Sequence, residues 1–138
     1  MARKSKYGVT DAEGNVVKKW MAGLYIRLSR EDGDKDESDS VSNQRMLLRE
    51  YSAKLPDVEV ADYFIDDGWT GTNFERPGFI RLMEQIKAGS LNCVIVKDLS
   101  RFGRNYIEVG NYLEQIFPFM GVRFISIADS LDSYGNPG

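Results

Sequence analysis

The stretch Tyr25-Ile26-Arg27-Leu28-Ser29 constrains the fold of this chain more than any other. Apolar and polar side chains alternate along it, which indicates a β-strand whose successive side chains point to opposite faces. Arg27 and Ser29 then share a face, and a guanidinium buried in a core is costly unless it is paired. Two interpretations remain open on these residues alone. The strand runs out into a polar turn, or it ends at the crevice of an open α/β sheet, where Arg27 holds an anion that Ser29 attacks.

Composition excludes several kinds of catalytic site. The chain has 138 residues, 42% of them hydrophobic, which suits one domain with one core. The sequence contains no histidine, and this excludes a Ser-His-Asp triad and any histidine metal site. Its single cysteine, Cys93, cannot form a thiolate zinc site and lies in an apolar run, as a reduced core thiol of a cytoplasmic protein does. The formal net charge of −3 means that any polyanion must bind at a local basic cluster.

Strand-like and helix-like segments alternate along the chain. We expect strands at 22–28, 58–65, 91–96 and 122–127, with helices ending near Lys54, Ala88 and Met120. This order predicts an α/β fold, with a mostly parallel four- to five-stranded sheet and helices on both faces. No run approaches the ~18 apolar residues of a membrane span. The apolar stripes of the three helices are Leu47, Leu48 and Tyr51; Phe79, Leu82, Met83 and Ile86; and Tyr106, Val109, Leu113, Ile116, Phe117 and Met120.

The two ends of the chain are less regular. Residues 1–20 are polar and contain at most a small hairpin built on Val9, Val16 and Val17, and residues 129–138 read as a loop or linker. Residues 30–39 have no apolar side chain and predict a solvated loop.

Polar residues follow each predicted strand, and parallel strands would bring them to one edge of the sheet. Arg101 and Arg104 are three residues apart, so on a helical turn they lie side by side and suit a phosphate, although a solvated helix start explains them equally well. Arg76 and Asp67 each have an ordinary loop or capping interpretation when taken singly. Taken together with Ser29, these arginines and Asp67 favour a phosphoryl-transfer reaction in which the arginines stabilise the charge that develops on the phosphate.

Four motifs in this order resemble the catalytic domain of the serine recombinases, the resolvase and invertase family. The chain is most similar to the large serine recombinases of transposons and integrative elements. The resemblance covers residues 21–133, which leaves 1–20 as a weakly structured extension and 134–138 as a truncated linker. It implies a resolvase-like catalytic domain with flavodoxin-like topology. The motifs are Tyr25 to Ser29, Ser42-Asn43-Gln44, Asp67-Gly68-Trp69-Thr70-Gly71 through Arg76-Pro77-Gly78, and Asp98 to Arg104.

The resemblance also implies a mechanism. Ser29 is expected to attack double-stranded DNA and form a 5′-phosphoserine link, without a metal or a nucleotide cofactor. The implied assemblies are a homodimer on each site and a homotetramer at synapsis, with no membrane association. The implied catalytic residues are Ser29, Arg27, Arg76, Arg101 and Arg104, and the supporting residues are Tyr25, Gln44, Asp67 and Thr70.

Two departures from the family pattern bear on this expectation. Ser100 stands where small resolvases usually have aspartate, and the acidic loop at 30–39 is long. Because no dimerisation helix or DNA-binding domain is visible before Gly138, this fragment alone is expected to be inactive.

Two alternatives remain. One is a non-enzymatic receiver-like or flavodoxin-like interaction module, which leaves Arg27 unexplained. The other is a phosphatase-like hydrolase, for which the cysteine loop and metal ligands are missing.

Overall fold

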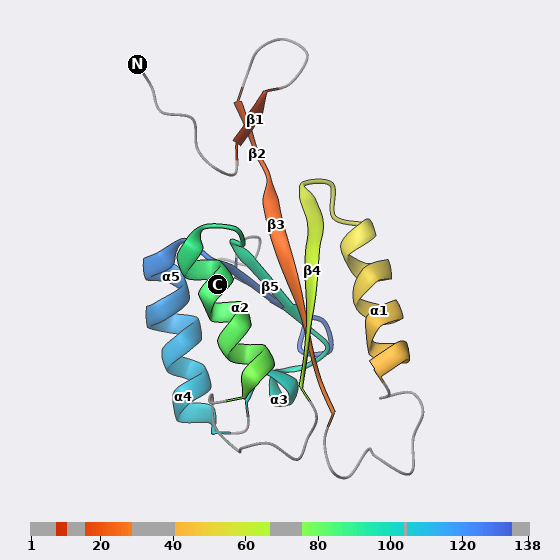
Figure 1. Ribbon diagram of the computed structural model, residues 1–138, viewed down its shortest axis with the longest axis vertical. Coiled ribbons are helices and arrows are strands. Elements are labelled where there is room, and N and C mark those ends of the chain that lie inside the picture. The colour runs from red at the N-terminus through yellow and green to blue at the C-terminus, as the bar shows by residue number, and fades with distance from the viewer. Residues whose placement is uncertain (1–7, 11–15, 29–40, 67–75, 104, 134–138) are drawn as a thin grey trace.

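A computed structural model describes residues 8–10, 16–28, 41–66, 76–103 and 105–133 (Figure 1). Its main feature is one five-stranded sheet with helices packed on both faces. No helix in the described ranges is long and apolar enough to cross a membrane.

Four of the five strands of the sheet run parallel, as the alternating order of elements predicts. The strand order is β4-β3-β5-β6-β7, and only the last pair, β6 with β7, is antiparallel. Numbered from β3, this is the 2-1-3-4-5 order of flavodoxin-like sheets, so the predicted fold class is confirmed. The strands are β3 (Trp20–Arg27), β4 (Val58–Asp66), β5 (Cys93–Val96), β6 (Arg123–Ser126) and β7 (Leu131–Asp132).

The helices divide between the two faces of the sheet. In Figure 1, α1 lies on one side of the strands, and α2, α4 and α5 lie on the other. The short α3 follows β5 at the carboxyl edge of the sheet, where β3 and β4 also end. The helices are α1 (Val41–Ala53), α2 (Pro77–Ala88), α3 (Leu99–Phe102), α4 (Tyr106–Asn111), the π-helical η2 (Tyr112–Ile116) and α5 (Phe117–Met120).

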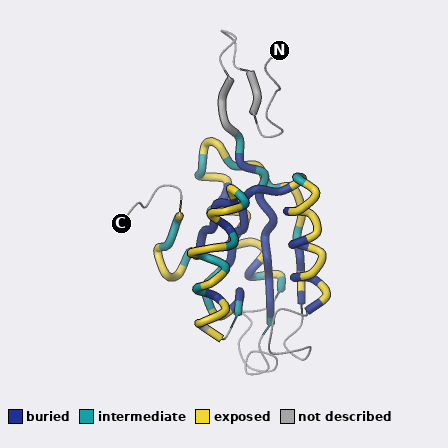
Figure 2. Tube along the Cα trace, turned by 90° about the vertical axis from the view of Figure 1, so that its left-hand side faces the viewer, coloured by how far each residue is buried: buried dark blue, intermediate teal, exposed yellow. Residues whose placement is uncertain are grey.

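Two apolar layers hold the helices against the sheet. Figure 2 shows the central strands as buried along most of their length. Tyr25, on one face of β3, packs with α2 and with Phe102 and Phe117, whereas Leu24 and Ile26 pack on the α1 side with Leu48. This alternation between faces is the strand pattern predicted from the sequence. Cys93 lies in the second layer, and its burial raises the pKa of the thiol from 9.0 to about 12.

Two glycines that end helices adopt the left-handed conformation that favours glycine. Gly89 has φ 87° and ends α2, and Gly121 has φ 73° and ends α5. The predicted hairpin in the N-terminal segment is also present, as β1 (Gly8–Thr10) paired antiparallel with β2 (Val16–Lys18). It projects from the end of the sheet opposite α3 (Figure 1).

Three details differ from the sequence prediction. Leu47 was expected on the inner face of α1, but it is 38% exposed; Leu48 is buried as predicted, together with Gln44 and Ser52. The third predicted helix is not uniform, because the N–H of Phe117 donates to the carbonyl of Tyr112, five residues earlier. The predicted C-terminal loop contains β7, which is held to β6 by two hydrogen bonds from the Arg123 guanidinium to the Asp132 carboxylate, at 2.8 and 2.6 Å.

Candidate active site

The candidate site lies at the carboxyl ends of the parallel strands, beside the junction of β3 and β5. The segment after β3 leads to α1 on one face, and the segment after β5 leads to α3 and α4 on the other. Such a switch point is where open α/β sheets bind ligands. Arg27 is the last residue of β3 and is 5% exposed, so the strand delivers a buried cation to this edge.

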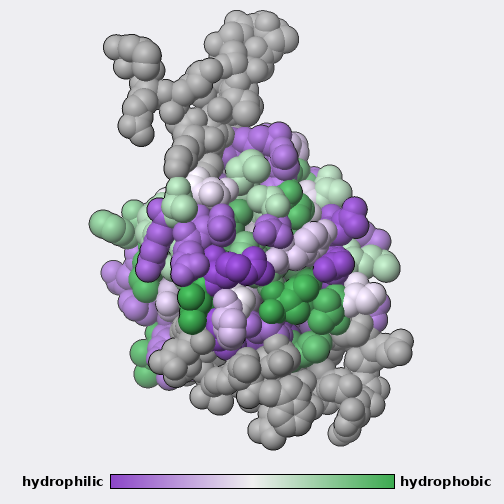
Figure 3. Space-filling view, viewed as in Figure 1, coloured by the Kyte–Doolittle hydropathy of each residue, from purple (hydrophilic) through white to green (hydrophobic). Residues whose placement is uncertain are grey.

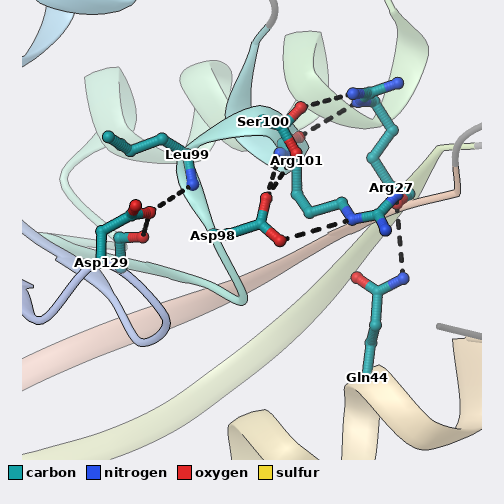
Figure 4. Close-up of polar contacts among 8 residues, drawn as sticks. Arg27, Gln44, Asp98, Leu99, Ser100, Arg101 and Asp129 are labelled. Carbon is teal, nitrogen blue, oxygen red and sulfur yellow. Dashed lines mark hydrogen bonds and ion pairs between the residues drawn. The ribbon is translucent and has the colours of Figure 1, made fainter. Parts of the chain in front are cut away.

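Arg27 contacts the backbone of α3. Its Nε donates to the carbonyl oxygen of Arg101 at 3.2 Å, and its Nη2 donates to the carbonyl oxygen of Ser100 (Figure 4). The last carbonyls of a helix have no partner within the helix and carry the negative end of its dipole. These carbonyls therefore satisfy donors of the guanidinium in the interior.

The backbone carbonyl of Arg27 also accepts hydrogen bonds from two side chains. Arg101 donates from Nη1 to the carbonyl oxygen of Arg27 at 3.2 Å, and Gln44 donates from Nε2 to the same oxygen at 3.4 Å. Gln44 is fully buried although it is polar, and it comes from α1 on the other face of the sheet. These contacts join Arg27, Gln44 and Arg101, which are three of the predicted site residues. Arg27 stands two positions before Ser29 in the sequence.

Arg76 joins the same group from the start of α2. Its Nη2 donates to the carbonyl oxygen of Phe102 at 2.7 Å, so the carbonyls of α3 hold two arginines. The guanidinium carbon lies 5.6 Å from the ring centre of Tyr25 and 5.8 Å from that of Phe79, within the range of cation–π contacts. Arg76 is 2% exposed, which makes it a buried residue rather than part of a surface loop.

Tyr25 and Asp66 fix the start of α2 beside the arginines. The Tyr25 hydroxyl donates to the Asp66 carboxylate at 2.8 Å, and that carboxylate also accepts from the N–H groups of Gly78 and Phe79, at 2.7 and 2.9 Å. Burial raises the pKa of Tyr25 far above its ordinary value, so the phenol stays a neutral donor. Asp66 thus caps a helix from a distant strand and anchors the segment that carries Arg76.

Asp98 and Asp129 hold the opposite end of α3. Asp98 accepts from the N–H of Arg101 at 3.1 Å and from the Ser100 hydroxyl at 2.5 Å, and it lies 4.0 Å from the Arg101 Nε. Asp129, in the turn after β6, accepts from the N–H of Leu99 at 2.9 Å. Figure 4 shows both carboxylates at the start of the same turn of helix.

Five of the nine predicted site residues lie in the described part of the chain, and their contacts place them close together. They are Tyr25, Arg27, Gln44, Arg76 and Arg101. The other four, Ser29, Asp67, Thr70 and Arg104, lie outside the described residues.

The sequence analysis did not single out Asp66 and chose its neighbour Asp67. A signal was present, because Asp66 stands two residues after Phe64 and therefore shares the inward face of β4. Both side chains are buried in the structure. The sequence analysis also missed Asp129, for which no comparable local pattern exists.

Comparisons with known proteins identify the family of this chain. Residues 22–138 match the family model of the resolvase N-terminal domain. Comparison with curated proteins gives no match.

Solved structures of recombinases share the fold. One is the N-terminal catalytic domain of TP901-1 integrase, with 26% identity, 86% of this chain and 85% of that chain covered, and a TM-score of 0.72. Another is a resolvase family site-specific recombinase from Streptococcus pneumoniae, with 31% identity, 86% and 78% coverage, and a TM-score of 0.68. The C-terminal catalytic domain of ISC1926 TnpA, an IS607-like serine recombinase, is 24% identical over 78% of this chain and 70% of that one. Its TM-score is 0.63, and it supports the fold alone.

The fold and the family match together define a catalytic domain of a site-specific serine recombinase, an enzyme that acts on DNA and works in an oligomeric assembly. The chain belongs to the resolvase family. The alternative of a receiver-like interaction module is not favoured.

Proposed function

We propose that Ser29 is the nucleophile of this recombinase and that Arg27, Arg76, Arg101 and Arg104 stabilise the phosphate it attacks. The observation that supports this most directly is the gathering of Arg27, Arg76 and Arg101 around α3, next to the segment that leads to Ser29. Arginine keeps its charge at every physiological pH, and its fork matches the oxygens of a phosphate.

The reaction is a displacement at phosphorus. The bond between the Ser29 oxygen and the phosphorus forms as the bond from phosphorus to the DNA 3′-oxygen breaks, and the departing strand takes up the proton as a 3′-hydroxyl. Negative charge grows on the phosphate oxygens during this step, and buried guanidiniums lower the barrier by stabilising it. The reverse attack by a 3′-hydroxyl rejoins DNA. The phosphoserine conserves the bond energy, so the proposed cycle uses no nucleotide and no metal.

The remaining predicted residues have positioning roles in this proposal. Gln44 holds the carbonyl of Arg27, and Tyr25 is tied through Asp66 to the helix that follows Arg76. Asp67 and Thr70 are proposed to support the same site from the segment before Arg76. The proposed domain spans residues 21–133, between an extension at 1–20 and a linker at 134–138.

The proposed assembly is a homodimer on each double-stranded DNA site and a homotetramer when two sites are paired. A serine attack on each of four strands requires four copies of Ser29, which a tetramer provides. We place the reaction in the cytoplasm, where the enzyme meets its DNA.

The experiment that tests this proposal replaces Ser29 by alanine in the recombinase that carries this domain. Ser29→Ala is expected to bind the recombination site as the wild type does and to form no covalent protein–DNA complex, because the attacking oxygen is gone. Gel separation under denaturing conditions measures the covalent complex, and mass spectrometry locates the modified residue.

Ser90→Ala is the matched control, because Ser90 is exposed and lies before β5, at the end of the sheet away from α3. It is expected to cleave normally. A covalent complex formed by Ser29→Ala at the wild-type rate would remove Ser29 from the mechanism.

A further inference from the structure

The turn after β6 is fixed beside the start of α3. Two backbone hydrogen bonds continue the pairing of β5 with β6 beyond the strands: Ile127 N–H to the Val96 carbonyl at 3.1 Å, and Ala128 N–H to the Lys97 carbonyl at 2.8 Å. The chain then reverses at Ser130, whose φ of 53° is the positive value of the left-handed region. Asp129 therefore stands at a defined place next to Leu99, the first residue of α3.

The Asp129 carboxylate joins two elements through one oxygen. Oδ2 accepts from the N–H of Leu99 at 2.9 Å and from the Ser126 hydroxyl at 2.7 Å. Ser126 is fully buried at the end of β6, so the contact is anchored in the sheet although Asp129 itself is exposed. The first N–H groups of a helix lack partners within it, and a carboxylate there is favourable.

A helix as short as α3 cannot hold its own position. It spans four residues, and its internal hydrogen bonding includes the Gly103 N–H to the Leu99 carbonyl at 3.1 Å. The carbonyls at its C-terminal end hold the side chains of Arg27 and Arg76, and Arg101 lies within it. A shift at the Leu99 end would be passed to all three arginines.

We propose that Asp129 is a positioning residue for the arginine group. By holding the Leu99 N–H against the end of β6, it sets where α3 lies and hence where its carbonyls place the guanidiniums of Arg27 and Arg76. The geometric claim concerns this chain alone, and its catalytic consequence rests on the proposed function. Because displacement of reacting groups by about 1 Å costs on the order of 10²-fold in rate, the contact bears directly on cleavage.

The test compares three variants of the 138-residue chain by nuclear magnetic resonance of the arginine Nε–H groups. Asp129→Ala removes both contacts, whereas Asp129→Asn keeps an oxygen that accepts from Leu99 and Ser126. Asp132→Ala is the matched control, because Asp132 lies three residues further on and its carboxylate accepts from Arg123 of β6. Its loss is expected to weaken β7 and lower the melting temperature while the start of α3 keeps its position.

The expected result is a change in the chemical shift and faster hydrogen exchange of the Arg27 and Arg101 Nε–H groups in Asp129→Ala. Asp129→Asn should restore the wild-type signals, and Asp132→Ala should leave them in place. Unmoved signals in Asp129→Ala, or equal changes in Asp132→Ala, would overturn the proposal. So would an asparagine variant that behaves as the alanine variant does. Should Asp129→Ala fail to fold, Ser126→Ala removes the buried anchor and must move the same signals.

A second measurement separates this inference from the proposed function. In the recombinase carrying the domain, Asp129→Ala is expected to lower the rate of covalent complex formation by on the order of 10²-fold with site binding unchanged, and Asp129→Asn to recover most of that loss. If Ser29→Ala cleaves DNA at the wild-type rate, the proposed function is contradicted, but the resonance result for Asp129 is unaffected. Normal cleavage by Asp129→Ala would contradict the positioning role.

Discussion

Arg27 is a buried cation whose hydrogen-bond partners on α3 are neutral carbonyl groups. A carboxylate partner would satisfy the guanidinium and also cancel its charge, which would weaken its attraction for a phosphate. Carbonyls at a helix C-terminus satisfy the donors with partial charges only. The contacts on α3 therefore place no full negative charge against the guanidinium, which suits the proposed role of Arg27 in binding a phosphate.

Arg101→Lys tests the importance of the guanidinium fork at the residue scale. Lysine keeps the charge, but it has a compact head and cannot reproduce a planar guanidinium, which here reaches the Arg27 carbonyl and lies near Asp98. We expect the cleavage rate to fall by on the order of 10²-fold with DNA binding little changed. Arg49→Lys, at an exposed position on α1, is the control. If Arg101→Lys cleaves DNA at the wild-type rate, the positive charge of Arg101 serves only to attract DNA.

Gly78→Ala tests the cap that Asp66 provides to α2. A Cβ at Gly78 would stand 2.8 to 2.9 Å from the Asp66 carboxylate, and the carboxylate has to move away from the N–H groups it accepts from. We expect the free energy of unfolding to fall by about 1–3 kcal/mol. Chemical denaturation measures it.

The matched control for that substitution is Gly110→Ala. Gly110 is also helical, but nothing lies within 4 Å of the added Cβ. Alanine there should stabilise the protein by up to about 1 kcal/mol, because it is the better helix former. Equal effects at the two positions would show that the Asp66 contact contributes nothing.

The sequence singles out most of the described residues that gather at this edge, but not Asp66. The motif order and the family resemblance pointed to Arg27, Gln44, Arg76 and Arg101, which lie together in the structure. The alternation from Phe64 along β4 was a signal for Asp66. The sequence could not indicate a role for Asp129, because its partner Leu99 lies thirty residues earlier and contributes only a backbone N–H group.

At the scale of elements, α1 offers a direct test of which face is buried. Leu48 is fully buried against the sheet, whereas its neighbour Leu47 is 38% exposed. Leu48→Ala should lower the free energy of unfolding by about 2–5 kcal/mol because it leaves a cavity. Leu47→Ala should change it by no more than about 0.5 kcal/mol. Thermal and chemical denaturation measure the stability of the two variants. A larger loss of stability in Leu47→Ala than in Leu48→Ala would mean that α1 packs against the sheet through the face that carries Leu47.

Elements with a recognisable sequence pattern were predicted, whereas β7 and the π-helical turn of η2 were not. The four parallel strands and α2 carry strong apolar patterns, and their positions in the structure agree with the sequence within a few residues. The two-residue β7 is too short to have a pattern, and the ion pair of Arg123 with Asp132 helps to hold it. The π-helical turn of η2 was also missed, because Leu113, Ile116 and Phe117 fit an ordinary helical stripe equally well.

At the scale of the whole molecule, charge limits what this chain does with DNA alone. The formal net charge is −3, and the face in Figure 3 mixes hydrophilic and hydrophobic groups. We expect the 138-residue chain to bind double-stranded DNA weakly, with a dissociation constant on the order of 10⁻⁴ to 10⁻⁶ M and no sequence preference. Few phosphates can contact an arginine group confined to one edge of the sheet.

A titration with the recombination site and a scrambled duplex, at two salt concentrations, measures this property. Equal and strongly salt-dependent affinities are expected, since phosphate contacts release counterions. Tight binding that prefers the recombination site would mean that the catalytic domain reads base sequence itself.

The contact between Arg27 and position 100 has a consequence for how this family can vary. Arg27 donates to the backbone carbonyl of Ser100, and every amino acid carries that group. The Ser100 side chain points elsewhere, to Asp98. An exchange of serine for aspartate at this position therefore leaves the partner of the arginine in place. Divergent members of such a family can therefore differ at this position without losing the contact that holds the arginine, and a sequence pattern that requires aspartate there would miss functional sequences.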